Sequence, residues 1–201
     1  MKNLLPALIL VGLLIGCATR GPIRERVVPL SFTVHVNTAA LVNHPAGPFT
    51  VDFQLTNGNG RSDGNSACTL SHFDFGAGGK PLGVPTVRGG ASGSLGSVVT
   101  LRTSTFLNEF TQTFAAGEKL KFQLDLTSTF EPGSTPDQFS FALLDKTGAE
   151  LPSTSPFAAL LKVDLNSVKP TVESFPTDSS RKPRGGGPVI AVDAPQIWPR
   201  R

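Results

Sequence analysis

The sequence predicts an all-β protein, folded as an antiparallel β-sandwich of the immunoglobulin-like or jelly-roll type. In residues 30–36, Leu, Phe and Val alternate with Ser, Thr and His, which is the period-two pattern of a half-buried strand. Runs of Gly, Asn, Asp and Pro separate this segment from others like it, as expected of turns. No window sustains the 3.6-residue period of an amphipathic helix.

Eight segments are candidate strands. The alternation is clearest at 30–36, 49–55, 120–126 and 139–143, and weaker at 67–75, 94–102, 106–114 and 159–165. Between Leu70 and Phe73 the phase slips by one residue, which predicts a β-bulge. Phe110 and Phe114 also fit the i,i+4 spacing of a helical turn, but we favour a strand there. Around the third clear strand the solvent-facing positions are Lys119, Lys121, Gln123 and Asp125.

The N-terminus has the pattern of an export signal. Lys2 precedes about a dozen apolar residues, which is the length of a secretory h-region and too short for a membrane span. Leu14-Ile15-Gly16-Cys17 then resembles the lipobox of bacterial lipoproteins. We therefore expect residues 1–16 to be removed and Cys17 to carry the lipid, which would anchor the protein to the membrane. Cleavage after Ala18, giving a secreted protein, is the alternative.

The rest of the chain divides by composition. We expect a linker at 17–28, the β-sandwich domain at 29–175, and a disordered basic tail at 176–201, because the tail is rich in Pro, Ser, Arg and Gly. Within that tail, the segment from Val189 to Trp198 is the part that could dock on the domain. Ala18 rather than Asp follows Cys17, which favours the outer membrane over the inner one.

The charge distribution argues against nucleic acid. The pI is near 9.1, but residues 27–175 hold nine Lys and Arg against twelve Asp and Glu. The basic excess therefore belongs to the two ends, where it can face anionic lipid headgroups. The predicted domain has no basic surplus with which to follow a phosphate backbone.

Residues 47–152 resemble a family of uncharacterised exported bacterial proteins, many of which end in a PEP-CTERM sorting signal. The matching stretches are Gly47 to Leu55, Asp63 to Asn65 with Leu70 to Gly76, Gly89 to Gly93, Phe106 to Gln112 and Thr135 to Asp145. The resemblance implies export and an all-β domain, and it implies no activity. The sorting signal itself is not matched, because no apolar span of membrane length precedes Arg200-Arg201.

Residues that could carry metal or redox chemistry are few. His35, His44 and His72 share no ligand motif, and we interpret Cys68 as a small buried residue rather than a reactive thiol. One loop could bind calcium through side-chain oxygens, with Asn57, Asn59, Asp63 and Asn65 as the candidate ligands. Arg61 interrupts that pattern, so a plain hairpin loop is favoured, and no cofactor is expected.

Catalytic residues are equally scarce. Glu109 and Asp137 could form the carboxylate pair of a glycoside hydrolase, but a turn Asp and a solvent-facing Glu are the simpler interpretation. There is no Tyr and a single Trp, Trp198, in the tail, so an aromatic platform for sugars is not expected.

We therefore expect a lipid-anchored cell-envelope protein that is not an enzyme and has a structural, adhesive or binding role. Its partners would be the membrane, through the N-terminal lipid, and an extracellular glycan or envelope protein. The alternative is a polysaccharide hydrolase or its accessory glycan-binding domain.

Overall fold

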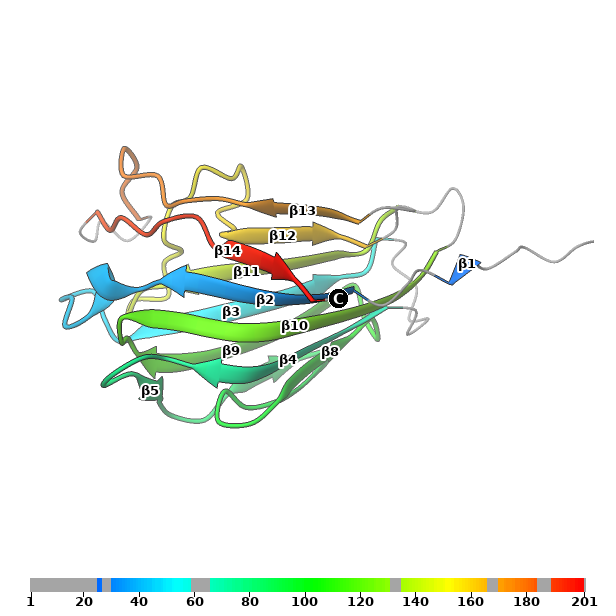
Figure 1. The fold of residues 1–201 in the computed structure, drawn as a ribbon, viewed down its shortest axis with the longest axis horizontal. Coiled ribbons are helices and arrows are strands. Elements are labelled where there is room, and N and C mark those ends of the chain that lie inside the picture. Colours follow the sequence, from blue (N-terminus) through cyan, green and yellow to red (C-terminus); the bar gives the residue numbers. More distant parts are fainter. Residues whose placement is uncertain are drawn as a thin grey trace, which may run out of the picture.

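Two antiparallel sheets packed face to face form the fold, as the sequence predicts (Figure 1). The computed structural model describes residues 25–26, 30–58, 66–130, 135–165, 170–183 and 189–200. Within them the only helix is the 3-10 turn η1 (Ala39–Leu41). No helix in these ranges combines the length and the apolar character needed to cross a membrane.

Sheet 1 contains seven strands and faces the viewer in Figure 1. Its order is β14 (Gln196–Pro199), β2 (Leu30–Asn37), β10 (Lys119–Phe130), β4 (Ser66–Asp74), β8 (Val99–Arg102) and β7 (Gly90–Gly93), and β1 (Glu25–Arg26) also pairs with β10.

Sheet 2 lies behind it and also contains seven strands. Its order is β13 (Thr171–Ser174), β12 (Leu161–Asp164), β11 (Gln138–Leu144), β3 (Phe49–Thr56), β9 (Leu107–Ala115) and β5 (Lys80–Pro81), and β6 (Thr86–Arg88) also pairs with β9. The chain crosses between the sheets from β2 to β3 and again from β3 to β4.

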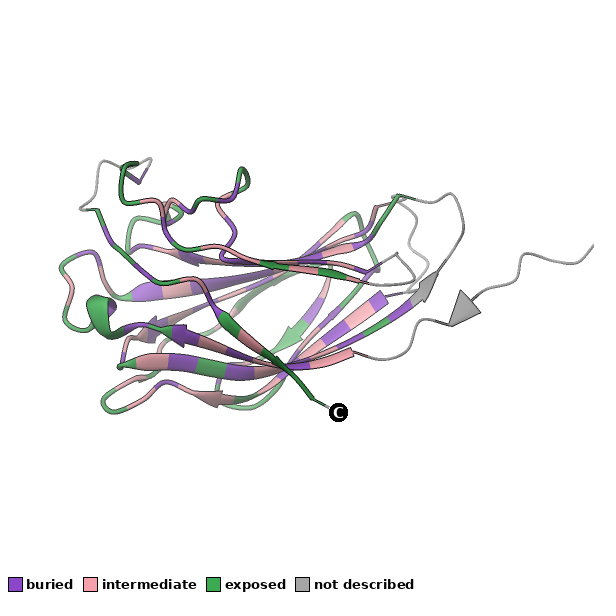
Figure 2. Cartoon of the chain, turned by 45° about the horizontal axis from the view of Figure 1, so that its top comes forward, coloured by how far each residue is buried: buried purple, intermediate pink, exposed green. Residues whose placement is uncertain are grey.

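Phenylalanine rings join the two sheets. Phe53 of β3 lies 5.2 Å from Phe141 and 5.4 Å from Phe122 between ring centroids, and Phe122 belongs to sheet 1. Each buried Phe side chain stabilises the fold by roughly 1.5–3 kcal/mol. Figure 2 shows the result as alternating buried and half-buried positions along the central strands.

The predicted bulge and strands are present. On β4, Ser71 pairs with Gln123 and Asp74 pairs with Lys121, so two residues oppose Phe122 alone. His72 takes the left-handed conformation, with φ 54°, as the extra residue of a bulge can. Segment 107–115 is strand β9, not a helical turn.

The C-terminal segment differs from the disordered tail expected after residue 175. Ile190 and Val192 are buried in the core, and Thr177 donates its N–H to the carbonyl of Val192 at 2.9 Å. β14 then pairs antiparallel with β2 along its whole length. Two alternating apolar residues are enough to hold this segment against the domain. They cover the core at the side of the sandwich where β13 and β14 are the edge strands of the two sheets.

Replacing Ile190 by Ala should therefore lower the free energy of unfolding by about 2 kcal/mol, since it removes buried methyl groups. Val189→Ala is the matched control, because Val189 is largely exposed and should change stability by less than about 0.5 kcal/mol. Urea denaturation measures both. Equal, small effects would mean that the segment does not pack on the core in solution.

Candidate functional site

Glu109 and Asp137, the carboxylates considered for catalysis, do not meet. Glu109 lies on the outer face of sheet 2, where its neighbour on β3 is Gln54. Asp137 is buried on the inner side, where its Oδ2 accepts a hydrogen bond of 2.5 Å from the Ser66 hydroxyl. The hypothesis of a Glu109–Asp137 catalytic pair is therefore wrong, because sheet 2 separates the two groups.

Asp137 has a structural role instead. Its second oxygen accepts the N–H of Gly58 at 2.9 Å, and Ser66 in turn lies 2.9 Å from the hydroxyl of Ser128. The carboxylate thus joins the end of β3 to β4 and β10 at one end of the sandwich. Buried carboxylates need such partners, because leaving one without them costs several kcal/mol.

The remaining predicted site residues are dispersed. Asn57 is buried, and its N–H donates to the carbonyl of Phe106, whereas Cys17, Asn59, Asp63 and Asn65 lie outside the described residues. In the part of the chain that the structure describes, no three His, Cys, Asp or Glu side chains are placed to hold a metal ion.

Cys68 is fully buried in the core, as predicted. Burial, with a smaller effect of Asp137, raises the pKa of its thiol well above the usual value. A thiol without access to solvent is not a nucleophile at neutral pH.

The residues that do gather lie on the outer face of sheet 1, around the single tryptophan. β14 pairs with β2 so that Trp198 stands opposite Thr33, beside His35. The rings of Trp198 and His35 stack with centroids 6.1 Å apart and an interplanar angle of 29°. Trp198 remains 49% exposed, so part of its ring is free for a ligand.

A shallow hollow of about 450 Å³ opens beside this stack. We call it the Trp198 hollow, and its lining consists of Thr33, His35, Lys119, Lys121 and Trp198. It continues on both sides, since a hollow of about 530 Å³ shares His35 and Lys119 with it and one of about 240 Å³ shares Thr33 and Lys121.

Some of the polar groups around the Trp198 hollow already have ion-pair or hydrogen-bond partners within the protein. The ammonium of Lys119 pairs with Asp74 at 2.7 Å, and this bond, with the N–H of Gly76, holds the pKa of Asp74 below its usual value. Gln123 donates to Asp125 at 2.8 Å and accepts from Arg200. Lys121 is exposed and has no ion pair among the described residues, so its ammonium is available to a ligand.

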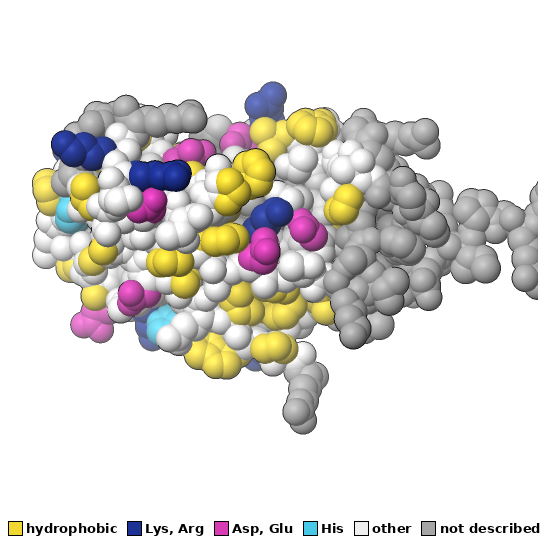
Figure 3. All heavy atoms as spheres, turned by 90° about the horizontal axis from the view of Figure 1, so that it is seen from above, with side chains coloured by type: hydrophobic (Ala, Val, Ile, Leu, Met, Phe, Trp, Pro, Cys, Tyr) yellow, Lys and Arg dark blue, Asp and Glu magenta, His cyan; other side chains and the backbone are white. Residues whose placement is uncertain are grey.

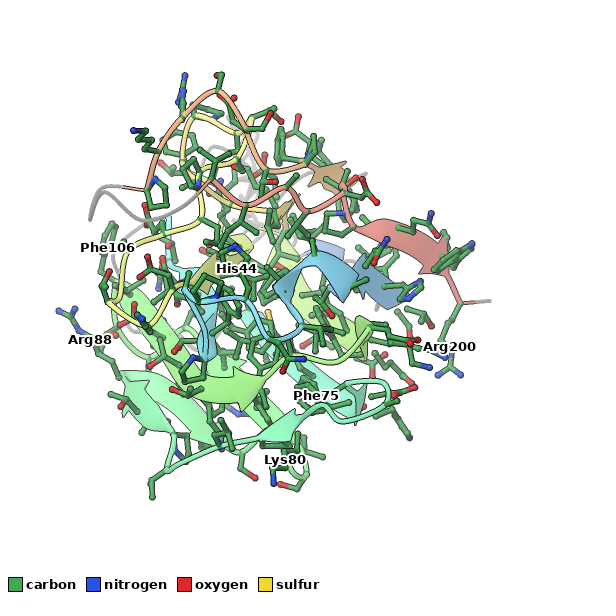
Figure 4. The ribbon with its side chains drawn as sticks, turned by 90° about the vertical axis from the view of Figure 1, so that its left-hand side faces the viewer. His44, Phe75, Lys80, Arg88, Phe106 and Arg200 are labelled. Carbon is green, nitrogen blue, oxygen red and sulfur yellow. The ribbon has the colours of Figure 1, made fainter. Side chains whose placement is uncertain are left out.

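Arg200 projects from this face at the right of Figure 4, where β14 meets β2. The arrangement places an exposed indole ring beside a free ammonium, a guanidinium and amide groups on the outer face of sheet 1. Such a surface can stack the apolar face of a ring and bond the polar groups at its rim. The sequence predicts the outward Lys119 and Lys121, but not that Trp198 joins them.

Comparisons with known proteins do not indicate what this surface binds. No protein-family model, no curated protein and no solved structure matches the chain. The resemblance to exported PEP-CTERM proteins therefore stays a prediction, and the function has to be argued from the surface itself.

A second polar cluster lies on the outer face of sheet 2, centred on Asp52. The side-chain N–H₂ of Gln54 donates to Asp52 Oδ2 at 2.7 Å and to Glu109 Oε1 at 3.2 Å. Asp52 is only 5% exposed, and its Oδ1 is buried with no hydrogen-bond partner among the described residues. Neither oxygen of Asp52 is open to a substrate in this arrangement.

Burial is the main reason why the carboxyl group of Asp52 has an unusually high pKa. It raises the pKa of Asp52 from 3.8 to about 7, with further contributions from the charges of Glu109 and Glu150, while the bond from Gln54 acts in the opposite direction. Between about pH 4 and pH 7 the folded protein therefore keeps a proton on Asp52 that the unfolded chain has already released.

Stability should consequently fall as the pH rises from about 4 to 7 and level off above that, since the folded state binds the extra proton in this window. Asp52→Asn keeps the shape and removes the titration, so at pH 8 it should be more stable than the native protein by about 2–4 kcal/mol. Near pH 4 the two should agree within about 1 kcal/mol.

Urea denaturation across this pH range measures the effect. The control is Asp164→Asn, which changes a less buried carboxylate on the same face and should still lose stability between pH 4 and 7, because Asp52 is unchanged. An Asp52→Asn protein that loses stability between pH 4 and 7 as the native chain does would contradict the assignment.

Proposed function

We propose that this protein is an exported, lipid-anchored cell-envelope protein whose β-sandwich binds an extracellular glycan at the Trp198 hollow without acting on it chemically. The single observation that carries the proposal is the exposed Trp198 ring, held beside His35 on the outer face of sheet 1. Around it, Lys121 and Arg200 offer N–H donors, and the hydroxyl of Thr33 can donate to or accept from a sugar hydroxyl.

The shape of this surface favours a chain of sugars over a small compact ligand. The three connected hollows follow β2 and β10 across the sheet, and none is a closed cavity. Small-molecule pockets usually enclose most of the ligand. An open surface with one aromatic ring suits a sugar polymer. One sugar can stack on Trp198 while the neighbouring sugars form hydrogen bonds with the polar groups around the hollows.

Titration with an oligogalacturonate and with a neutral cello-oligosaccharide tests the proposal. Because Trp198 is the only Trp and the chain has no Tyr, the intrinsic fluorescence reports this hollow alone. We expect a change with at least one of the two sugars. Isothermal titration calorimetry, which does not depend on the indole, should show that Trp198→Ala weakens binding about tenfold or more, equivalent to about 1.4 kcal/mol, and that Trp198→Phe loses less.

The control is Phe106→Ala, which removes an exposed aromatic ring from a different part of the surface and should leave this affinity unchanged. Unaltered fluorescence with both sugars, or equal affinity for the native and Trp198→Ala proteins, would refute the glycan-binding role at this hollow.

Export and anchoring have a separate test. The proposal rests on the apolar segment before Leu14-Ile15-Gly16-Cys17, since two acyl chains on a cysteine are sufficient for stable anchoring. The intact mass of protein from native membranes should equal the chain from Cys17 plus acyl groups. Cys17→Ala should abolish that form, and a lipid-free native chain beginning after Ala18 would instead indicate secretion.

A further inference from the structure

A second hollow, of about 410 Å³, lies between two loops away from sheet 1. One loop joins β11 to β12, and the other follows β13. We call it the Phe157 hollow, and its lining consists of Glu150, Pro152, Ser153, Ser155, Pro156, Phe157, Ala158, Arg181 and Lys182. It shares no residue with the three hollows on sheet 1.

Phe157 is held on the surface rather than packed. It is 71% exposed, although most other Phe rings of the described residues are in the core. Its N–H donates to the Ser155 hydroxyl at 3.2 Å, and the next residue, Ala158, adopts the left-handed conformation with φ 56°. A non-glycine residue there costs roughly 1 kcal/mol, so the turn that presents the ring is maintained against a local penalty.

One cation contacts this ring, and two others line the same hollow. The ammonium of Lys162 lies 5.9 Å from the ring centroid, within the range of a cation–π contact. Arg181 uses its Nε to bond Asp178 at 3.1 Å, which orients the guanidinium and leaves its terminal N–H groups without partners among the described residues. Lys182 is exposed beside it. Figure 3 looks onto this side, where basic, acidic and apolar side chains lie next to one another.

The polar floor of the Phe157 hollow is already satisfied. The Ser153 hydroxyl donates to the carbonyl of Ala159 at 2.8 Å and accepts the N–H of Ser155 at 3.1 Å. The unused donors therefore belong to Arg181 and Lys182, opposed by one carboxylate of the lining, Glu150. A planar guanidinium is the group best suited to a carboxylate, which it can bind through two parallel bonds.

We propose that the Phe157 hollow is a second saccharide site and that it selects acidic sugars, with a uronate carboxylate on Arg181 and Lys182 and the sugar ring against Phe157. The choice of a saccharide rests on the proposed function of the Trp198 hollow, whereas the acidic character rests on the terminal N–H groups of Arg181, which its bond to Asp178 leaves unused, and on the ammonium of Lys182. Figure 4 shows the loops of the Phe157 hollow at the top and the Trp198 face at the right.

Two separate sites on one chain have a functional consequence. A protein with a single site coats a polymer, whereas one with two sites can bridge two polymer chains or bind one of them twice, with a gain in avidity. The protein would thus cross-link an acidic matrix at the cell surface.

Isothermal titration with a short oligogalacturonate tests this inference. The native protein should bind one molecule more than the double variant Arg181→Ala with Lys182→Ala, and one more than Phe157→Ala alone. These side chains are exposed, so the melting temperature should not change. Lys80→Ala, which removes an exposed cation from β5 at the opposite edge of sheet 2, should leave the native stoichiometry unchanged.

Tryptophan fluorescence separates this inference from the proposed function. If the Phe157-hollow variants keep a stoichiometry equal to that of the native protein, the second site is refuted while the Trp198 signal stands. If Trp198→Ala has no effect and Phe157→Ala removes all binding, the second site is supported and the first is refuted. If the Phe157 hollow binds a neutral cello-oligosaccharide as tightly as the oligogalacturonate, the proposal that this hollow selects acidic sugars is refuted.

Discussion

Aromatic packing between the sheets is the constraint on which the rest of the structure depends. Phe53, Phe122 and Phe141 meet from both layers, and a strand that turns one of these rings inward must turn its neighbours outward. Lys121 and Gln123 face solvent because Phe122 between them faces the core. The polar outer surface that Trp198 joins is thus a consequence of core packing.

Strand parity accounts for what could and could not be predicted about the carboxylates. The clear strands were predictable, because long alternating runs have a single interpretation. The same alternation could have shown that Asp137, two residues before the inward-facing Phe139, also faces inward. Glu109, next to the buried Phe110, must face outward, so the two carboxylates lie on opposite sides of their sheet. The proximity of Asp52 and Glu109 was not predictable, since it needs the pairing of β3 with β9, and strand order is a tertiary property.

The C-terminal segment marks the limit of composition-based prediction. Residues 176–188 are dominated by Pro, Ser, Arg and Gly, and such an average indicates disorder. Ile190 and Val192 are buried nevertheless, because few apolar residues suffice where a preformed core has an open side. Trp198 was assigned to the tail for the same reason, and with it the only tryptophan of the candidate site was missed.

The position of Trp198 on an edge strand links binding to stability. β14 is four residues long and ends at Pro199, which has no N–H to offer a further strand, so it closes the edge of sheet 1 against aggregation. The same segment supplies Trp198 and, through Ile190 and Val192, covers the core. A ligand held on Trp198 would also favour the docked state of β14, since anything that binds only the folded form stabilises it. Point substitutions are therefore needed to separate the two roles, because deleting the segment removes both together.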